Sequence, residues 1–565
     1  MDGSISFGTL STTNGTPRLG GTASKLDTES ILEATYEAKR LPAVRLENRT
    51  SRNEEKIAAF EEMRSLLGSL KTAVDGLRNP PGFFGAEQNI FETKQAFFSS
   101  SSTVPPGEIA GVAIANDAAV GSFDLTVMQL ASAEKLSTTG TGAADATLGD
   151  AWNGGSAFAG TLDVGLAGVT AATIAVDSGM TVYDLRDQIN AERATTGVRA
   201  SVLKVADDDF RLVMTAEETG KAISLGDSTG IAGGFPSSQL QAAEPAIFEI
   251  DGVEITRLQN QVDDILPGVT INLFKADAGT TISVSVEPSL GDIKERIASF
   301  VEVYNGFRDF VDAQSAVDAD GRAAADAALF GDRTMRSLVS GLGAVIGGGV
   351  SGLDQGAMAS LRAVGVEIDG NNRLTIDDAA LDNALLTKLD EVRGVFEFRL
   401  QSSSSELAIF SRTNALAVNA FTIEITDADA DGTPEAVTID GVAAEFDGST
   451  IKGADGTPFE GLEFLWTGQG STTIDVEVSQ GIADRVFNLV APATETLNGS
   501  ITQAVDNLKD INGNYAKQIE RIEDRALRAR ELLLERFTAM EAAMSLANTM
   551  LTQIRAQIDA MTADS

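Results

Sequence analysis

The sequence is 565 residues long, which is too long for one ordinary hydrophobic core, so roughly two to four domains are expected. Hydrophobic residues make up 43% and charged residues 22%, which is typical of a folded chain. The absence of Cys and His excludes disulfides, Cys or His nucleophiles, Ser-His-Asp triads, and zinc sites built from thiolate or imidazole. Chemistry by paired carboxylates, Lys, Tyr or an oxygen-liganded metal stays open.

The negative charge belongs to the middle of the chain. The sequence holds 43 basic and 82 acidic residues, a net charge of −39. Residues 1–80 hold 11 of each sign and residues 515–565 hold 7 basic and 8 acidic, so the stretch between them carries −38 by subtraction. A surface this negative disfavours nucleic acid and anionic membranes, because phosphate binding needs clustered Lys and Arg. We therefore expect ends that pack against partners and a middle that faces water.

No secretory signal or membrane insertion is expected. The first residues lack a basic stretch followed by an apolar one, and no run of about 18 apolar residues could span a bilayer. Taken alone, these features indicate a cytoplasmic protein. The complete absence of Cys instead fits a chain that avoids thiol chemistry outside the cell.

Two helical stretches are predicted near the N-terminus, after residues 1–21, which are rich in Gly, Ser and Thr. Asp27 is a predicted helix cap, with Glu29 in the first turn where the helix dipole favours it. This helix is expected to be interrupted near Pro42. A longer helix, residues 45–77, follows and ends before two consecutive prolines. Its apolar residues recur every three or four positions and form one stripe: Ile57, Phe60, Met63, Leu67, Leu70, Val74 and Leu77.

From about 90 to 287 the sequence predicts short alternating strands. Residues 122–127 are one example, and residues 247–252 end in Asp-Gly, which indicates a hairpin. One helix, roughly 181–193, is expected within this region. From Leu290 two or more helices are predicted up to about 415, and a second strand-rich stretch over about 420–478.

The last segment has the most regular pattern. Its apolar residues alternate spacings of three and four, which is a heptad seam of a coiled coil. Both terminal segments present single apolar stripes, so they are expected to pair with each other, with copies in other subunits, or with both. Met is frequent here and suits surfaces that pack against more than one partner. The seam residues are Phe537, Met540, Met544, Ala547, Leu551, Ile554, Ile558 and Met561.

The predicted fold is α+β and multidomain, with coiled-coil terminal segments and a helical leg domain that enclose an inserted β-rich head. Residues 1–50 and 515–565 form the terminal coiled coil. Residues 51–90 and 288–514 form the leg domain, which includes the strand-rich stretch 420–478. Residues 91–135 with 245–287 form one head subdomain, and 136–244 form a distal one.

No pattern argues for catalysis or for a bound cofactor. Asp427, Asp429 and Asp431 precede a Gly, as at the start of a calcium loop, but Thr438 stands where a bidentate Glu is needed. A solvated acidic turn is therefore favoured over a calcium site. The many adjacent carboxylates are expected from the acidic composition alone. A glycosidase needs two carboxyl groups that face each other across a cleft, and adjacency in the sequence does not indicate such an arrangement.

Several motifs, in this order, resemble the flagellar hook-associated protein 2 family, the flagellar filament cap. The opening motif, residues 21–31, combines a small-residue turn with Leu-Asp-Thr and a helix. The stretch 420–478 departs from the resemblance because it is longer and more acidic, and a Gln-rich run near the first long helix is absent. The other motifs are AVGSF at 119–123, VMQLASA at 127–133, DL at 184–185 with IN at 189–190, FEIDG at 248–252, PGVT at 267–270, FVEVYN at 300–305, LFGD at 329–332, VGV at 364–366 with LTID at 374–377, and GIAD at 481–484.

The resemblance implies a secreted structural protein and no enzyme. Such proteins form a homo-oligomeric ring at the distal filament tip, under which exported flagellin folds and inserts, next to partners such as flagellin and the hook-filament junction protein. Export by the flagellar type III route, with an uncleaved signal, is implied as well. A cytoplasmic export chaperone would hold the C-terminal helix through Phe537, Met540, Met544, Leu551, Ile554 and Ile558.

Two alternatives remain open at this point. Another flagellar axial protein, a hook-filament junction protein or flagellin, would share helical ends around a β-rich middle. An acidic, calcium-dependent surface adhesin is suggested by the 427–432 turn, and a calorimetric calcium titration would distinguish it from a cap.

Overall fold

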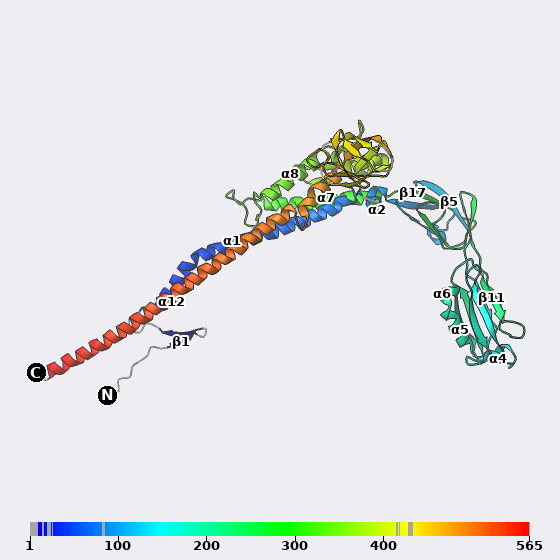
Figure 1. The fold of residues 1–565 in the computed structure, drawn as a ribbon, viewed down its shortest axis with the longest axis horizontal. Coiled ribbons are helices and arrows are strands. Elements are labelled where there is room, and N and C mark those ends of the chain that lie inside the picture. The colour runs from blue at the N-terminus through cyan, green and yellow to red at the C-terminus, as the bar shows by residue number, and fades with distance from the viewer. Residues whose placement is uncertain are drawn as a thin grey trace. The chain divides into compact units, whose positions relative to one another are not determined.

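The structure is a computed structural model (Figure 1). It describes residues 10–13, 16–19, 24, 26–81, 85–413, 416, 418–427 and 433–563. The chain divides into two compact units. The first comprises residues 1–82 and 296–565, and the second residues 83–295. Long helices and separate antiparallel sheets occur together, which confirms the predicted α+β multidomain class.

The second unit contains two hydrophobic cores, and the first of them lies between two sheets. The strand order is β14-β13-β5-β17-β3 in one sheet and β15-β16-β4 in the other. Short helices stand beside them: α2 (Gly85–Gln88), η1 (Ile90–Glu92) and α3 (Pro106–Ile109). The strands are β3 (Lys94–Ser100), β4 (Ala110–Ile114), β5 (Gly121–Gln129), β13 (Ala246–Ile250), β14 (Val253–Arg257), β15 (Gln261–Val262), β16 (Val269–Leu273) and β17 (Thr281–Pro288).

Both strand predictions for this part are confirmed. Residues 122–127 lie inside β5, and their buried residues alternate with exposed ones. The predicted Asp-Gly hairpin joins β13 to β14, with Asp251 at φ 49° and Gly252 at φ 77°. A two-residue turn needs positive φ at both positions, which Asp tolerates and Gly adopts freely.

The other core of the second unit, drawn from residues 136–231, lies among two further sheets and a helix. The predicted helix 181–193 is confirmed as α5 (Val182–Ala191) followed by α6 (Arg193–Thr196). Thr181 and Asp184 start α5 with reciprocal hydrogen bonds, a capping box. The sheet orders are β12-β6-β10-β9 and β11-β7-β8, with α4 (Leu148–Trp152). The strands are β6 (Lys135–Thr138), β7 (Ala159–Leu166), β8 (Ala172–Asp177), β9 (Val198–Ala206), β10 (Asp209–Ala216), β11 (Ile223–Ser228) and β12 (Ser237–Gln241).

The first unit is built on two very long helices, α1 (Thr28–Asp75) and α12 (Ser500–Ala563). The end of α1 packs against α11, which also packs against α8. The predicted stripe is buried from Phe60 to Leu77, where these helices meet. The other helices are α7 (Leu290–Gln314), α8 (Arg333–Gly347), η2 (Leu361–Val364), α9 (Asp378–Thr387), α10 (Leu389–Phe396) and α11 (Ile482–Thr494). Two hairpins accompany them: β1 (Leu10–Thr13) with β2 (Thr16–Leu19), and β18 (Val366–Ile368) with β19 (Leu374–Ile376).

The predicted interruption of the first helix near Pro42 is wrong. Asp27 caps α1 as predicted, accepting a hydrogen bond from the Ser30 N–H (3.0 Å), and the helix then runs through Pro42 without a break. A proline inside a helix removes one backbone hydrogen bond. Pro42 is exposed while its neighbour Ala43 is fully buried, so tertiary packing on that side holds the helix together.

The second strand-rich stretch begins at residue 398 rather than about 420, so helices do not continue to 415 as predicted. It contains two antiparallel sheets, in the orders β20-β28-β22-β23-β24 and β21-β27-β26-β25, around their own core. The first strand, β20, pairs with β28, and the paired residues are 74 to 82 positions apart (Ser402 with Val476, Phe398 with Gln480), so no local pattern marks it. The strands are β20 (Phe398–Ser402), β21 (Leu407–Arg412), β22 (Ala420–Thr426), β23 (Ala436–Ile439), β24 (Val442–Ala443), β25 (Glu445–Asp447), β26 (Thr450–Lys452), β27 (Leu462–Trp466) and β28 (Thr472–Gln480).

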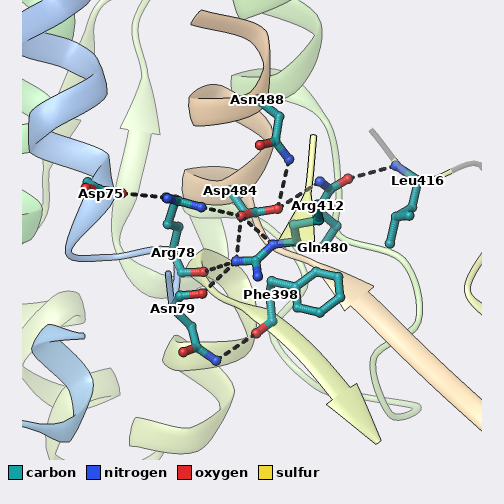
Figure 2. A network of polar contacts seen from close by, with 9 residues as sticks. All are labelled: Asp75, Arg78, Asn79, Phe398, Arg412, Leu416, Gln480, Asp484 and Asn488. Carbon is teal, nitrogen blue, oxygen red and sulfur yellow. Dashed lines mark hydrogen bonds and ion pairs between the residues drawn. The ribbon is translucent and has the colours of Figure 1, made fainter. Parts of the chain in front are cut away.

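A buried polar network joins this strand-rich part to the end of α1 (Figure 2). Asp484 on α11 is fully buried, and its Oδ1 accepts a hydrogen bond from Arg412 Nε (2.9 Å). Its Oδ2 accepts from Gln480 Nε2 (2.8 Å) and Asn488 Nδ2 (3.1 Å). Arg412 Nη2 also donates to the carbonyl oxygens of Arg78 (3.1 Å) and Asn79 (2.6 Å). One carboxylate thus connects α11 with β21, and Arg412 carries the connection on to the end of α1.

Burial lowers the pKa of Arg412, and the charge of Asp484 and its hydrogen bond oppose that shift. The ring of Phe398 lies 4.2 Å from the Arg412 guanidinium carbon. Arg78 stacks in the same way on Phe487, at 3.5 Å. Both guanidinium groups are therefore held by an aromatic ring as well as by a carboxylate.

The four-part division of the chain predicted from the sequence remains a proposal. Its boundaries near 135 and 245 fall between the two cores of the second unit.

Candidate partner-binding surface on the terminal helices

The helices α1 and α12 pack against each other as an antiparallel pair, blue and orange-red in Figure 1. Polar contacts fix their register: Arg64 Nη1 donates to Thr502 Oγ1 (3.5 Å), and Asn53 Nδ2 donates to Asn512 Oδ1 (2.8 Å). At the far end the Ser24 N–H donates to Glu541 Oε1 (3.2 Å). Because residue numbers fall on one helix as they rise on the other, the two terminal helices form one antiparallel coil.

A charged contact holds the middle of this coil. Arg40 Nε donates to Glu523 Oε1 on α12 (3.1 Å), while its Nη2 reaches Glu47 on its own helix (2.6 Å). The hydrogen bond to Glu523, helped by the charge of Glu47, raises the pKa of Arg40. Ala526, one turn further along α12, is 1% exposed and marks the side that faces α1. Small and polar side chains therefore set the spacing and the register of this pair.

Beyond Glu541 the helix α12 has no such cover among the described residues. Every residue from 542 to 559 is exposed, and residues 542–554 carry no charged side chain. A helix in water usually exposes polar and charged residues, and an exposed apolar patch of this kind marks an interaction site. We call residues 542–554 the free end of α12.

The six site residues predicted from the sequence divide between the coil and its free end. Phe537 and Met540 are half-buried and lie just before Glu541. The other four are exposed, between 37% and 54%: Met544, Leu551 and Ile554 lie on the free end, and Ile558 lies just beyond it. The seam therefore begins inside the coil and continues past it.

Two apolar residues of this surface were missed by the seam prediction. Leu546 is 59% exposed and Met550 is 52% exposed, and neither belongs to the three-and-four pattern. A single stripe describes a helix with one neighbour, whereas the described residues leave every side of this end exposed. The lack of charge over residues 542–554 is the sequence signal that points to them.

The free end could dock on an apolar groove or on further helices. Leu and Ile supply most of its apolar surface, and flexible Met side chains adapt to partners of different shape. No helix in the described part of the chain is long and apolar enough to cross a membrane.

The calcium hypothesis gains no support from the described residues. Asp427 is buried, its Oδ2 accepts a hydrogen bond from the Gly470 N–H (2.8 Å), and its own N–H donates to Ser471 Oγ (3.0 Å). These contacts make Asp427 part of the turn next to β28. Asp429 and Asp431 lie outside the described residues.

Comparison with known families covers most of the chain. Residues 24–134 match the flagellar hook-associated protein 2 N-terminus, and residues 243–549 match the flagellar hook-associated protein 2 C-terminus. Residues 161–218 match the flagellin hook IN motif. The C-terminal match alone spans more than half of the chain.

Individual relatives agree with these matches. The A-type flagellar hook-associated protein 2 of Pseudomonas aeruginosa is 27% identical over 406 residues, 67% of this chain and 80% of that protein. The flagellar hook-associated protein 2 of Salmonella typhimurium is 31% identical over 232 residues, 38% of this chain and 48% of that protein. The D1-D2-D3 domains of the flagellar cap protein of Escherichia coli align with a TM-score of 0.49 and 19% identity, over 80% of this chain and 99% of that one. From the two family matches, which together run from residue 24 to residue 549 with one gap, it follows that the chain belongs to the flagellar hook-associated protein 2 family.

Proposed function

We propose that this protein caps the distal tip of the bacterial flagellar filament, as a homo-oligomeric ring that promotes the folding and insertion of exported flagellin. The observation that carries the proposal is its membership of the flagellar hook-associated protein 2 family over more than half of its length. The role is structural and needs no catalytic residue. The proposed location is outside the cell, after export of the chain.

The terminal coil suits this role. It brings both ends of the chain together, and its free end leaves an uncharged apolar surface without cover from described residues. Such a surface can hold one partner before export and another at the filament. We assign these two partners as a cytoplasmic export chaperone and the filament subunits below the cap.

A complementation experiment tests the cap function. In a strain that lacks its own cap protein, flagellin is lost to the medium if nothing retains it at the tip. Expression of this chain, together with its cognate flagellin, should restore filaments that are visible by electron microscopy and retain flagellin. Continued release of monomeric flagellin, with the chain present at normal levels in the medium, would refute the proposal.

A second experiment tests the free end. Replacing Met544, Leu551 and Ile554 with Gln should abolish capture of the chaperone and lower export of the chain. A matched control replaces exposed polar residues of the same segment, Asn548, Thr552 and Gln553, with Ala, and should leave chaperone binding unchanged. Equal binding by the two variants would show that the apolar surface is not the docking site.

The alternative axial proteins predict a different phenotype. A hook-filament junction protein would be required at the base, so its loss would leave bare hooks even when a cap is supplied.

Deletion of residues 537–565 tests whether the C-terminal helix is needed for filament growth but not for folding of the head. The head should still fold while filament growth stops. Protease-resistant fragments of the second unit, unchanged by the deletion, would show that the head is intact.

A further inference from the structure

The two flanks of α12 carry opposite charges over residues 520–536. An α-helix turns about 100° per residue, so positions can be placed around the axis relative to Ala526, which faces α1. One flank, which we call the acidic flank, consists of Glu520, Leu527, Glu531 and Leu534. The other, the basic flank, consists of Arg521, Arg525, Arg528, Leu532 and Arg536. All nine residues are exposed.

This segregation differs from an ordinary solvated helix, on which charges of both signs alternate along each face. Arg521 and Arg525 are four residues apart, and like charges at that spacing destabilise a helix. Their Nε atoms donate to backbone carbonyls, of Lys517 (3.1 Å) and Arg521 (3.0 Å) respectively. Neither has an ion pair with any residue that the structure describes. The basic flank thus holds two cations that no described carboxylate neutralises.

The basic flank is also hollowed. A shallow groove runs along α12 between residues 518 and 528, and it is lined by three arginines and one carboxylate: Gln518, Arg521, Ile522, Asp524, Arg525 and Arg528. On the acidic flank, Leu527 and Leu534 project at 46% and 48% exposure. A groove with a net positive charge on one flank and leucines flanked by carboxylates on the other flank are complementary in charge.

We propose that the acidic flank of one copy binds the basic flank of α12 in a second copy, with the two helices parallel and in register. Both flanks occupy the same stretch of one helix, so a rotation about an axis parallel to α12 brings them to the same height. The contact joins two different surfaces, so it repeats from copy to copy and closes into a ring at a suitable angle. This inference rests on the proposed ring and names one surface through which its subunits contact each other.

Charge reversal tests the contact on the full-length chain. The basic-reversed variant is Arg521→Glu with Arg525→Glu, and the acid-reversed variant is Glu520→Arg with Glu531→Arg. The basic-reversed variant leaves no net positive charge on its basic flank, and the acid-reversed variant makes both flanks positive, so in each case the attraction between copies is lost. Exposed pairs are individually weak, and we expect the association constant measured by sedimentation velocity at low salt to fall by about tenfold or more.

Mixing the two variants is the decisive measurement. In the mixture the acidic flank of the first variant meets the basic flank of the second, and the two reversed flanks meet at the other surface, so association should return to within a few-fold of the wild-type value. Added salt should weaken the wild-type and the mixed assemblies alike, because these charges are exposed. A matched control for the basic-reversed variant, Arg45→Glu with Arg52→Glu on α1, changes the net charge by the same amount and should associate as wild type. Circular dichroism checks that every variant keeps its helices.

Several results would overturn the inference. Variants that associate like wild type, or a mixture that fails to associate, would exclude this contact while leaving the ring itself possible through other surfaces. Loss of filament binding with unchanged self-association would assign the basic flank to an acidic helix of another protein. A wild-type chain that stays monomeric at all concentrations would refute the ring, and with it the proposed function.

Discussion

Replacing Asp484 with Asn should destabilise the strand-rich part of the first unit severely. The substitution keeps the shape of the side chain and removes the anion that two buried cations share. Arg412 Nη2 lies 2.8 Å from Asp484 Oδ1, and the two side chains are 1% and 0% exposed. Arg78 Nη1 lies 3.6 Å away, with a side chain that is 9% exposed.

The magnitude follows from that burial. Breaking a buried ion pair by removing one partner costs about 3–5 kcal/mol, because the remaining charge stays desolvated. A whole domain is typically stable by only about 5–15 kcal/mol. With a urea m-value of about 2 kcal/mol/M, the unfolding midpoint should fall by roughly 1.5–2.5 M.

Tryptophan fluorescence can isolate this part of the molecule. The chain has two tryptophans, Trp152 in the second unit and Trp466 on β27. β27 pairs with β21, the strand that carries Arg412, so in a Trp152→Phe background Trp466 reports on unfolding beside the network. The midpoint in urea is then read from a single probe in the full-length chain.

Asp75→Asn is the matched control. Asp75 accepts a hydrogen bond from Arg78 Nε (2.6 Å) in the same network, but its side chain is 39% exposed. Ion pairs that reach solvent contribute about 0–1 kcal/mol, so this change should move the midpoint by about 0.5 M or less. A double variant with Asp484→Leu and Arg412→Met should recover part of the loss, because it leaves fewer unpaired buried charges. Equal midpoints for Asp484→Asn and Asp75→Asn would refute the reasoning.

Three further predictions concern the helices. Pro42→Ala should stabilise α1 by up to about 3 kcal/mol, because it restores a backbone hydrogen bond. A midpoint temperature that is unchanged or lowered, in a thermal melt followed by circular dichroism at 222 nm, would contradict this. Ala526 is 1% exposed where α12 faces α1, so Ala526→Asp places a charge between the two helices and should separate them. The separation should appear as rapid hydrogen exchange at the middle of both helices, whereas Ala543→Asp on the free end should leave the exchange unchanged. Burial raises the pKa of Tyr304, so the unfolded chain releases the phenol proton first and stability should fall as the pH rises above about 10. Tyr304→Phe should lessen that alkaline loss, and an unchanged pH profile would show that the burial of Tyr304 does not cause it.

Features set by neighbours along the chain could be predicted from the sequence. The apolar residues from Phe60 to Leu77 repeat every three or four positions, and a helix needs only this local period to place them on one side. The Asp251-Gly252 hairpin could be predicted in the same way, because two adjacent residues with positive φ determine the turn. Both predictions rest on geometry within a few residues.

Features set by distant partners could not be predicted in this way. Propensity places a helix end at Pro42, yet the fully buried Ala43 beside it shows that packing overrides that preference. The strand β20 starts at Phe398 because it pairs with β28, and the intervening residues give no sign of that partner. The network around Asp484 draws on α1, β21, β28 and α11, so no spacing in the sequence could indicate it.

The near-neutral charge of the last segment shows the same limit and has a consequence for assembly. With 7 basic and 8 acidic residues, positions 515–565 resemble an unremarkable balanced helix, and composition favours packing without saying against what. Only the position of the buried Ala526 shows that Glu520 and Glu531 lie on one flank while Arg521 and Arg525 lie on the other. A balanced helix with both signs mixed on every side would attract a charged neighbour equally from any direction. A balanced helix with separated charges attracts an acidic neighbour on one side and a basic neighbour on the other. Such a helix favours a parallel, in-register copy over an inverted one, because inversion places residues at different heights and mismatches the flanks. The charge pattern would therefore set the orientation of neighbouring chains, while the uncharged free end beyond it stays available to other partners.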